Sequence, residues 1–190
     1  MTSQRKANRF GTFLAVALAL LCWDATSMRA QSPSATPKPF SSEVSPRRAP
    51  LADTYLENLV GDWTITRKIR GLTVTNSMRG EWVLQHQFVQ LHMVDSLEPP
   101  AYEALVLVGY DAGAKKYVAH WCDNFGGQFS GVGYGRLQNN RVEFVFDYAE
   151  GPFHNTFSWD PLSKTWTFLM QSETADGTRQ FFAEDTLRKK

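Results

Sequence analysis

Two acidic residues stand where apolar runs of the sequence meet polar segments. Asp123 ends an alternating run in which Ala119 and Trp121 share its face, and Glu103 directly precedes the apolar residues 104–108. A carboxylate at the dry mouth of an apolar interior has a raised pKa and can act as a general acid or base. Asp123 also begins a glycine-rich segment, where aspartate often caps its own turn. Asp123 could therefore be a catalytic acid or base or a turn-capping residue. Glu103 is predicted to point inward as well.

Amide and aromatic side chains could complete a binding site around these acids. Asn124 and Asn155 could orient a polar group of a ligand, while aromatic rings would supply the apolar lining that small-molecule sites usually have. The predicted ligand-contacting residues are Glu103, Trp121, Asp123, Asn124, Asn155, Phe144 and Trp166.

The histidines do not converge on a metal site in the predicted strands. His120 and His154 fall on the polar faces of their runs, and His86 and His92 are six residues apart, which is about 20 Å on a strand. Protein metal sites need several ligands around one ion. We therefore predict neither a metal nor a cofactor.

Cys122 is the only thiol that would remain if the first thirty residues, which carry Cys22, are removed. No intramolecular disulfide is then possible. We expect Cys122 to be a buried small apolar residue, and its spacing to His120 does not predict a nucleophilic pair.

Three glycines, Gly131, Gly133 and Gly135, recur at a spacing of two. A phosphate loop would need a helix directly after them, but a strand end and a turn at Asn139-Asn140 follow instead. The glycines share one strand face, so either the sheet bends there or space opens inside. The bend is the favoured interpretation, and the cavity is the functional alternative.

The elements that would position these residues are mostly strands. From Asp62 onward the apolar period is two, most clearly over residues 141–148, 153–159 and 165–171, with a strong turn signal at Asp176-Gly177. We predict an all-β domain over residues 51–190, an antiparallel up-and-down barrel of about eight to ten strands, with a sandwich as the alternative.

A short helix should precede the barrel and cover one end. Thr54 to Glu57 has the spacing of a capping box, and Gly61 could end the helix. Trp63 would close the bottom of the barrel. A cation from the last strand could stack on the Trp63 indole, and Arg188 is the candidate by chain position.

The N-terminal segment predicts export. Arg5, Lys6 and Arg9 precede residues 10–23, which carry no charge and, as a helix, would reach only about 21 Å. We expect residues 1–30 to be a signal peptide cleaved after Ala30, with Ser27 as the alternative and an uncleaved anchor as the runner-up. The protein would then be periplasmic or secreted, with no membrane span after cleavage.

Residues 31–50 hold five prolines among Ser, Thr, Lys and Arg, and are predicted to be a disordered linker. The whole chain has 20 Lys+Arg and 19 Asp+Glu. A nucleic-acid-binding protein would show a basic excess, so that class of partner is not expected.

The order of these parts resembles the lipocalin, or calycin, plan. Gly61-Asp62-Trp63, Gly109-Tyr110-Asp111, Lys115-Lys116-Tyr117-Val118 and the string Trp121-x-Asp123-Asn124-x-Gly126 are similar to a bacterial family described as domain of unknown function 1579. The resemblance covers about residues 55–190 and implies a lipocalin-like barrel without an established reaction. The nitrobindin branch, which ligates haem through a histidine near its C-terminus, differs because residues 181–187 hold no histidine.

Three functions are consistent with this pattern. The first is an exported protein that binds a small apolar or amphipathic molecule inside an aromatic barrel. The second is a barrel enzyme, a hydrolase or isomerase, with Asp123 or Glu103 as general base. The third is a structural envelope module with a filled interior. Binding is preferred over catalysis, and the pattern does not specify an oligomeric state.

Overall fold

The computed structural model describes residues 48–190, so the predicted signal peptide and all but the end of the predicted linker lie outside the described residues. The described part contains one short helix, one 3₁₀ turn and eleven strands. Their bounds are α1 (Thr54–Glu57), β1 (Gly61–Ile69), β2 (Leu72–Val83), β3 (Phe88–Asp95), β4 (Glu103–Asp111), β5 (Lys116–Asp123), η1 (Gly127–Phe129), β6 (Gly131–Gly135), β7 (Leu137–Gln138), β8 (Arg141–Tyr148), β9 (Gly151–Asp160), β10 (Thr165–Glu173) and β11 (Arg179–Lys189).

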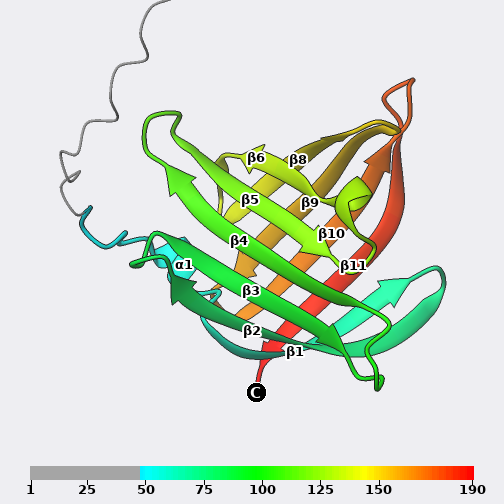
Figure 1. The fold of residues 1–190 in the computed structure, drawn as a ribbon, viewed down its shortest axis with the longest axis horizontal. Helices are drawn as coiled ribbons and strands as arrows, with labels where there is room; N and C mark the ends of the chain where they lie inside the picture. The colour runs from blue at the N-terminus through cyan, green and yellow to red at the C-terminus, as the bar shows by residue number, and fades with distance from the viewer. Residues whose placement is uncertain (1–47) are drawn as a thin grey trace, which may run out of the picture. The chain divides into compact units, whose positions relative to one another are not determined.

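The strands form a closed antiparallel barrel (Figure 1). Each strand from β1 to β6 pairs with its neighbour in the chain, as does each strand from β8 to β11, and β1 pairs with β11. Closure comes from β6 and β8, which pair at Tyr134 and Val145, while the two-residue β7 lies beside β8. The barrel proper therefore has ten strands, which confirms the predicted fold class.

Alternation along the strands explains why this sequence closes into a tube. In β8, Val142, Phe144 and Phe146 are buried, and the residues between them lie on the outer face. The inward rings pack closely: Phe157 and Phe168 stack with their centroids 3.7 Å apart. Burial of these rings on the inner face of the sheet, with the polar outer face in water, is the main driving force for this architecture.

Helix α1 covers one end of the barrel (Figure 1). Its Tyr55 side chain donates a hydrogen bond to the Phe157 carbonyl at 2.9 Å. Just after the helix, the Asn58 carbonyl accepts from the Trp166 indole at 2.9 Å and the Leu59 carbonyl accepts from the Trp63 indole at 3.0 Å. The last two bonds satisfy carbonyls that the end of the helix leaves free.

Two details of this end differ from the sequence-based expectation. The N-cap of α1 is Asp53, which accepts from the Leu56 amide, and not Thr54; Gly61 begins β1 and does not end the helix. The cation over the Trp63 ring is Lys189, at 5.3 Å, because Lys189 is the register partner of Trp63 in β11. Arg188 is one residue away and so belongs to the opposite face.

The space beside Gly131, Gly133 and Gly135 is filled by neighbouring atoms and is not a cavity. A Cβ atom at Gly133 would lie 2.7 Å from two ring atoms of Phe146, and one at Gly131 would lie 2.9 Å from the Tyr148 hydroxyl. At Gly135 a Cβ atom would collide with the Glu143 carbonyl oxygen. The three glycines therefore allow β6 to lie closely against β8 where the barrel closes, and the cavity interpretation is wrong.

The predicted hairpin turns are present. Asn139 and Asn140 both have positive φ, at 52° and 59°, and Gly177 has φ 81°. Two-residue turns with left-handed angles match the twist of the strands that they join. Within residues 48–190, no helix is both long and apolar enough to cross a membrane.

Candidate functional site

The two ends of the barrel differ in chemistry. The end at α1 is filled by large rings, among them the fully buried Trp63 and Trp166. The β1–β2 and β10–β11 hairpins project at the opposite end (Figure 1). The inward-facing Arg67 lies close to this end, two residues before the end of β1. A binding site inside this barrel therefore belongs at the end opposite α1.

A buried ion pair lies in the interior near this end. Arg67 of β1 donates to Asp185 of β11 through Nε and Nη2, both at 2.7 Å, and both side chains are buried. The Arg67 guanidinium also lies over the Tyr102 ring, 4.7 Å from its centroid. Burial raises the pKa of Tyr102 to about 12, so its hydroxyl stays protonated. The guanidinium is thus committed to a carboxylate and an aromatic face.

Two buried amides complete the polar interior and lack a partner for one oxygen each. Asn76 of β2 is 5% exposed and Asn155 of β9 is 2% exposed, and neither Oδ1 atom accepts a hydrogen bond. Both residues lie on the inward face of their strands, Asn76 two positions from Met78 and Asn155 two positions from Phe157. A buried acceptor without a donor costs about 1–3 kcal/mol and is rare in native proteins. These oxygens are ready to accept hydrogen bonds from a bound molecule.

Exposed apolar side chains surround the same end of the barrel, and we refer to them as the rim. They come from the β1–β2 hairpin, the β3–β4 loop, the β5–β6 loop and the start of β11: Leu72, Leu97, Phe125, Phe129 and Phe182. Phe125 alone is 63% exposed. Phe125 also contacts Phe129, with ring centroids 6.4 Å apart, and exposed rings in contact are typical of interaction sites.

The rim is joined to the interior by a series of rings in contact. Phe182 meets Phe153 edge-on at 5.4 Å, Phe153 meets Tyr148 at 6.3 Å, and Tyr148 is parallel to Phe146 at 6.2 Å. Phe146 in turn meets Trp121 at 6.4 Å. An apolar ligand entering at the rim would therefore meet aromatic surface continuously as far as Trp121.

Most residues predicted for the site face the interior, but they lie at different depths. Trp121 and Asn155 lie near the polar interior, whereas Phe144 and Trp166 are fully buried in the packed core. Asp123 is half-buried on the inward face, and its Oδ1 accepts from the Phe125 amide at 3.1 Å, which is the turn-capping role.

Two predicted residues are placed elsewhere. Glu103 lies on the outer wall, where its Oε1 is 2.7 Å from His92 Nε2, so the predicted inward orientation is wrong. Asn124 joins loops: it accepts from the Glu103 amide and donates to the Ala101 carbonyl. Glu103 and Asp123 are therefore on opposite faces of the wall and cannot act on one substrate.

The interior polar residues that sequence reasoning missed are Arg67, Asn76 and Asp185, together with the half-buried Tyr102 that lies against Arg67. A signal for one of them was available, because Arg67 follows Trp63 and Ile65 at a spacing of two and so shares their inward face. Its partner could not be read in this way, because Asp185 is 118 positions away.

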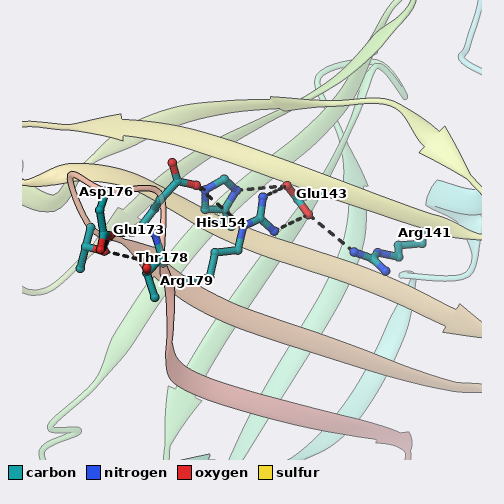
Figure 2. Close-up of polar contacts among 8 residues, drawn as sticks. Arg141, Glu143, His154, Glu173, Asp176, Thr178 and Arg179 are labelled. Atoms are coloured by element: carbon teal, nitrogen blue, oxygen red, sulfur yellow. Dashed lines mark hydrogen bonds and ion pairs between the residues drawn. The ribbon is translucent and has the colours of Figure 1, made fainter.

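A second polar cluster lies on the outer wall across β8 to β11 (Figure 2). His154 Nδ1 is 3.1 Å from Glu143 Oε1, and its Nε2 is 2.9 Å from Glu173 Oε2. Arg179 donates two bonds to Glu143, at 3.0 and 2.8 Å, and lowers the pKa of that carboxyl. His154 is thus on the outer face as predicted, but it is only 5% exposed.

The partners in this cluster satisfy one another. Each ring nitrogen of His154 faces a carboxylate oxygen, and Arg179 contacts both of these carboxylates. The cluster links four neighbouring strands, and we assign it to holding the wall together.

The other residues considered as site candidates, Cys122 and His86 among them, do not form a site. Cys122 is exposed on the outer wall, so the expectation of a buried thiol is wrong. His86 lies in the β2–β3 turn stacked on Trp82. An open surface depression of about 380 Å³ beside it is lined by Arg48, Pro50, Gln85 and His86. Among residues 48–190, no group of three or more His, Cys, Asp or Glu side chains is arranged to hold a metal ion.

Comparison with known proteins supports the fold. The chain is similar to the crystal structure of Rv2717c from M. tuberculosis, with a TM-score of 0.51 and 9% sequence identity over 73% of this chain and 98% of that chain. At this identity the likeness is one of fold, an antiparallel β-barrel. No family model and no curated protein matches the chain.

Proposed function

We propose that the protein is an exported, lipocalin-like binding protein that holds a small apolar or amphipathic molecule at the end of the barrel opposite α1. The observation that carries this proposal is the exposed aromatic rim, joined by rings in contact to a buried layer of incompletely bonded polar groups. Small barrels of this kind have room for one such ligand. Export rests on the pattern of residues 1–30, and membership of the domain of unknown function 1579 family rests on the Gly109-to-Gly126 motifs.

Binding is favoured over catalysis by the positions of the two acids. Glu103 faces solvent on the outer wall and Asp123 caps the turn that begins η1. General acid–base catalysis needs a group within hydrogen-bond reach of the substrate. With Glu103 outside, the interior acids are Asp123, held by its own loop, and Asp185, already paired with Arg67.

The proposal is tested with N-phenyl-1-naphthylamine, an uncharged probe whose fluorescence rises in apolar surroundings. The full chain should bind it saturably, and Phe125→Ser combined with Phe182→Ser should weaken binding at least fivefold because both rings leave the rim. Leu162→Ser is the matched control, since Leu162 is 94% exposed in the β9–β10 turn at the other end. Absence of saturable binding, or equal weakening by Leu162→Ser, would refute the proposal.

A further inference from the structure

We infer that the ligand of this barrel carries an uncharged hydrogen-bond donor, a hydroxyl or amide N–H, which binds at the buried amide oxygen of Asn155 or of Asn76. This inference rests on the proposed function and specifies the chemistry of the ligand head. It follows from what the interior offers: two buried acceptors without donors, and a buried cation, Arg67, that is already paired with Asp185.

The acceptors define what the head must supply. Asn155 Oδ1 and Asn76 Oδ1 are closed off from solvent and unpaired. The neighbours of Asn76 do not supply a donor: its register partner Asp95 is an acceptor, already bonded to the amides of Leu97 and Tyr102. A ligand hydroxyl or amide N–H would remove the cost of leaving one of these oxygens unbonded.

Anionic heads are disfavoured by the same groups. A carboxylate or phosphate brings no donor for the unpaired amide oxygens, and the nearby Arg67 already uses Nε and Nη2 on Asp185. Asp123, half-buried on the inward face, adds negative charge near the mouth. An anion would therefore lose its hydration without gaining a counter-ion.

Cationic heads are disfavoured for the complementary reason. Asp185 is the fully buried acid of this layer, and Arg67 already neutralises it with two short bonds. A second cation beside this pair would be buried without a carboxylate of its own. An uncharged donor can pair with one of these amide oxygens at no electrostatic cost.

The tail of the ligand would follow the aromatic series toward the rim. Asn155 lies two positions from Phe153, which contacts Phe182 of the rim. Access to the closed Asn155 oxygen requires side chains to move, and its register partner Met170 has the flexible, unbranched side chain that such movement needs. The ligand is thus an amphiphile with its donor head inward and its apolar part toward the rim.

The test compares octan-1-ol, 1-methoxyoctane and octanoate as competitors of N-phenyl-1-naphthylamine on the full chain at pH 8. Octan-1-ol keeps the donor, the methyl ether removes it, and octanoate is an anion. In Asn155→Leu the ratio of the ether to the alcohol inhibition constant should fall about 3- to 10-fold relative to wild type, the value of one neutral hydrogen bond. Using this ratio cancels the difference in hydrophobicity between the two competitors.

Stability gives an independent readout on the same variant. If Asn155 is kept for a ligand, then Asn155→Leu, which removes an unpaired buried oxygen, should raise the unfolding midpoint of the unliganded protein. A lowered midpoint would show that Asn155 is structural and would overturn the inference. Asn76→Leu provides a second variant with the same two expectations, so poor folding of either one leaves the other decisive.

The outcomes separate this inference from the proposed function. Loss of all saturable probe binding refutes the proposed function itself. Saturable binding with an ether-to-alcohol ratio that is unchanged in both variants, or octanoate competing more strongly than octan-1-ol, overturns the donor-head inference and leaves the binding function standing.

Discussion

Arg67 and Asp185 join the first and last strands of the barrel through two hydrogen bonds of 2.7 Å inside the wall. One residue further along, Lys68 and Glu184 make the equivalent pair on the outer face, at 3.0 Å and well exposed. The two pairs share the same two strands and differ in burial. They therefore form a natural comparison of what burial does to an ion pair.

Removing one partner of the inner pair should be strongly destabilising. Asp185→Asn or Arg67→Gln leaves a buried charge without its counter-ion, which costs about 3–5 kcal/mol. Urea unfolding of the full chain measures this free energy. Lys68→Gln is the matched control and should cost about 0–1 kcal/mol, because water screens the exposed pair.

The double variant Arg67→Met with Asp185→Leu tests the cause of that loss. Replacing both charges with apolar groups removes the desolvation cost along with the attraction, so this variant should recover most of the stability lost in either single variant. A double variant as unstable as the sum of the singles would contradict the assignment of the cost to the unpaired charge.

The sequence was sufficient to predict the barrel because burial alternates along nearly every strand. Phe144, Phe157, Trp166 and Phe168 are inside, as expected, and the Asn139-Asn140 turn has the left-handed angles that its residue types favour. Register was harder to predict. Trp63 receives Lys189 and not Arg188, a difference of one residue that the closing pair of strands β1 and β11 decides.

The orientation of Glu103 was predicted wrongly because the sequence of β4 does not show the alternation of apolar and polar residues. Leu105, on the outer wall, is 47% exposed, so residues 104–108 read as uniformly apolar and the alternation disappears. Asp185 could not be paired with Arg67 from sequence, because the pair depends on closure between the first and last strands. The candidate site thus combines a residue that alternation finds, Asn155, with residues that only the closed barrel brings together.

The glycine at position 133 should be intolerant of a side chain. A methyl group there would lie 2.7 Å from the Phe146 ring, so Gly133→Ala should cost about 1–3 kcal/mol through overpacking where β6 meets β8. Thermal or urea unfolding measures the effect. Gly127→Ala is the control, because a Cβ atom at Gly127 meets nothing within 4 Å. Adding Phe146→Leu to Gly133→Ala should recover part of the loss; failure to do so would locate the strain elsewhere.

The contact between Lys189 and Trp63 should contribute measurably at the α1 end. The ammonium lies 5.3 Å from the indole of a fully buried tryptophan, a geometry worth about 0.5–1 kcal/mol at a partly exposed site. Lys189→Met, which keeps the aliphatic stem, should lower the free energy of unfolding by that amount. Arg188→Met should change it less, and the opposite ranking would show that the cation on the other face is the stabilising one.

Glu143 should make the free energy of unfolding of the barrel fall at acidic pH. Hydrogen bonds from Arg179, with further help from His154, lower the pKa of this carboxyl in the folded state below its unfolded value of about 4.3. The unfolded state therefore binds the proton first. The stabilisation is fully present above the unfolded pKa and is lost as pH falls through the lower, folded pKa.

Urea unfolding at a series of pH values between about 7 and 3 tests this dependence, around the ordinary glutamate pKa. Glu143→Gln should cost about 1–2 kcal/mol at neutral pH, since Arg179 and His154 lose a charged partner, and it should flatten the acid limb of the curve. Glu150→Gln, in the exposed β8–β9 turn, is the control and should leave that limb unchanged. If Glu143→Gln and wild type lose stability in parallel below neutral pH, the outer-wall cluster does not carry the acid dependence, and its carboxylates would have to be paired differently in solution.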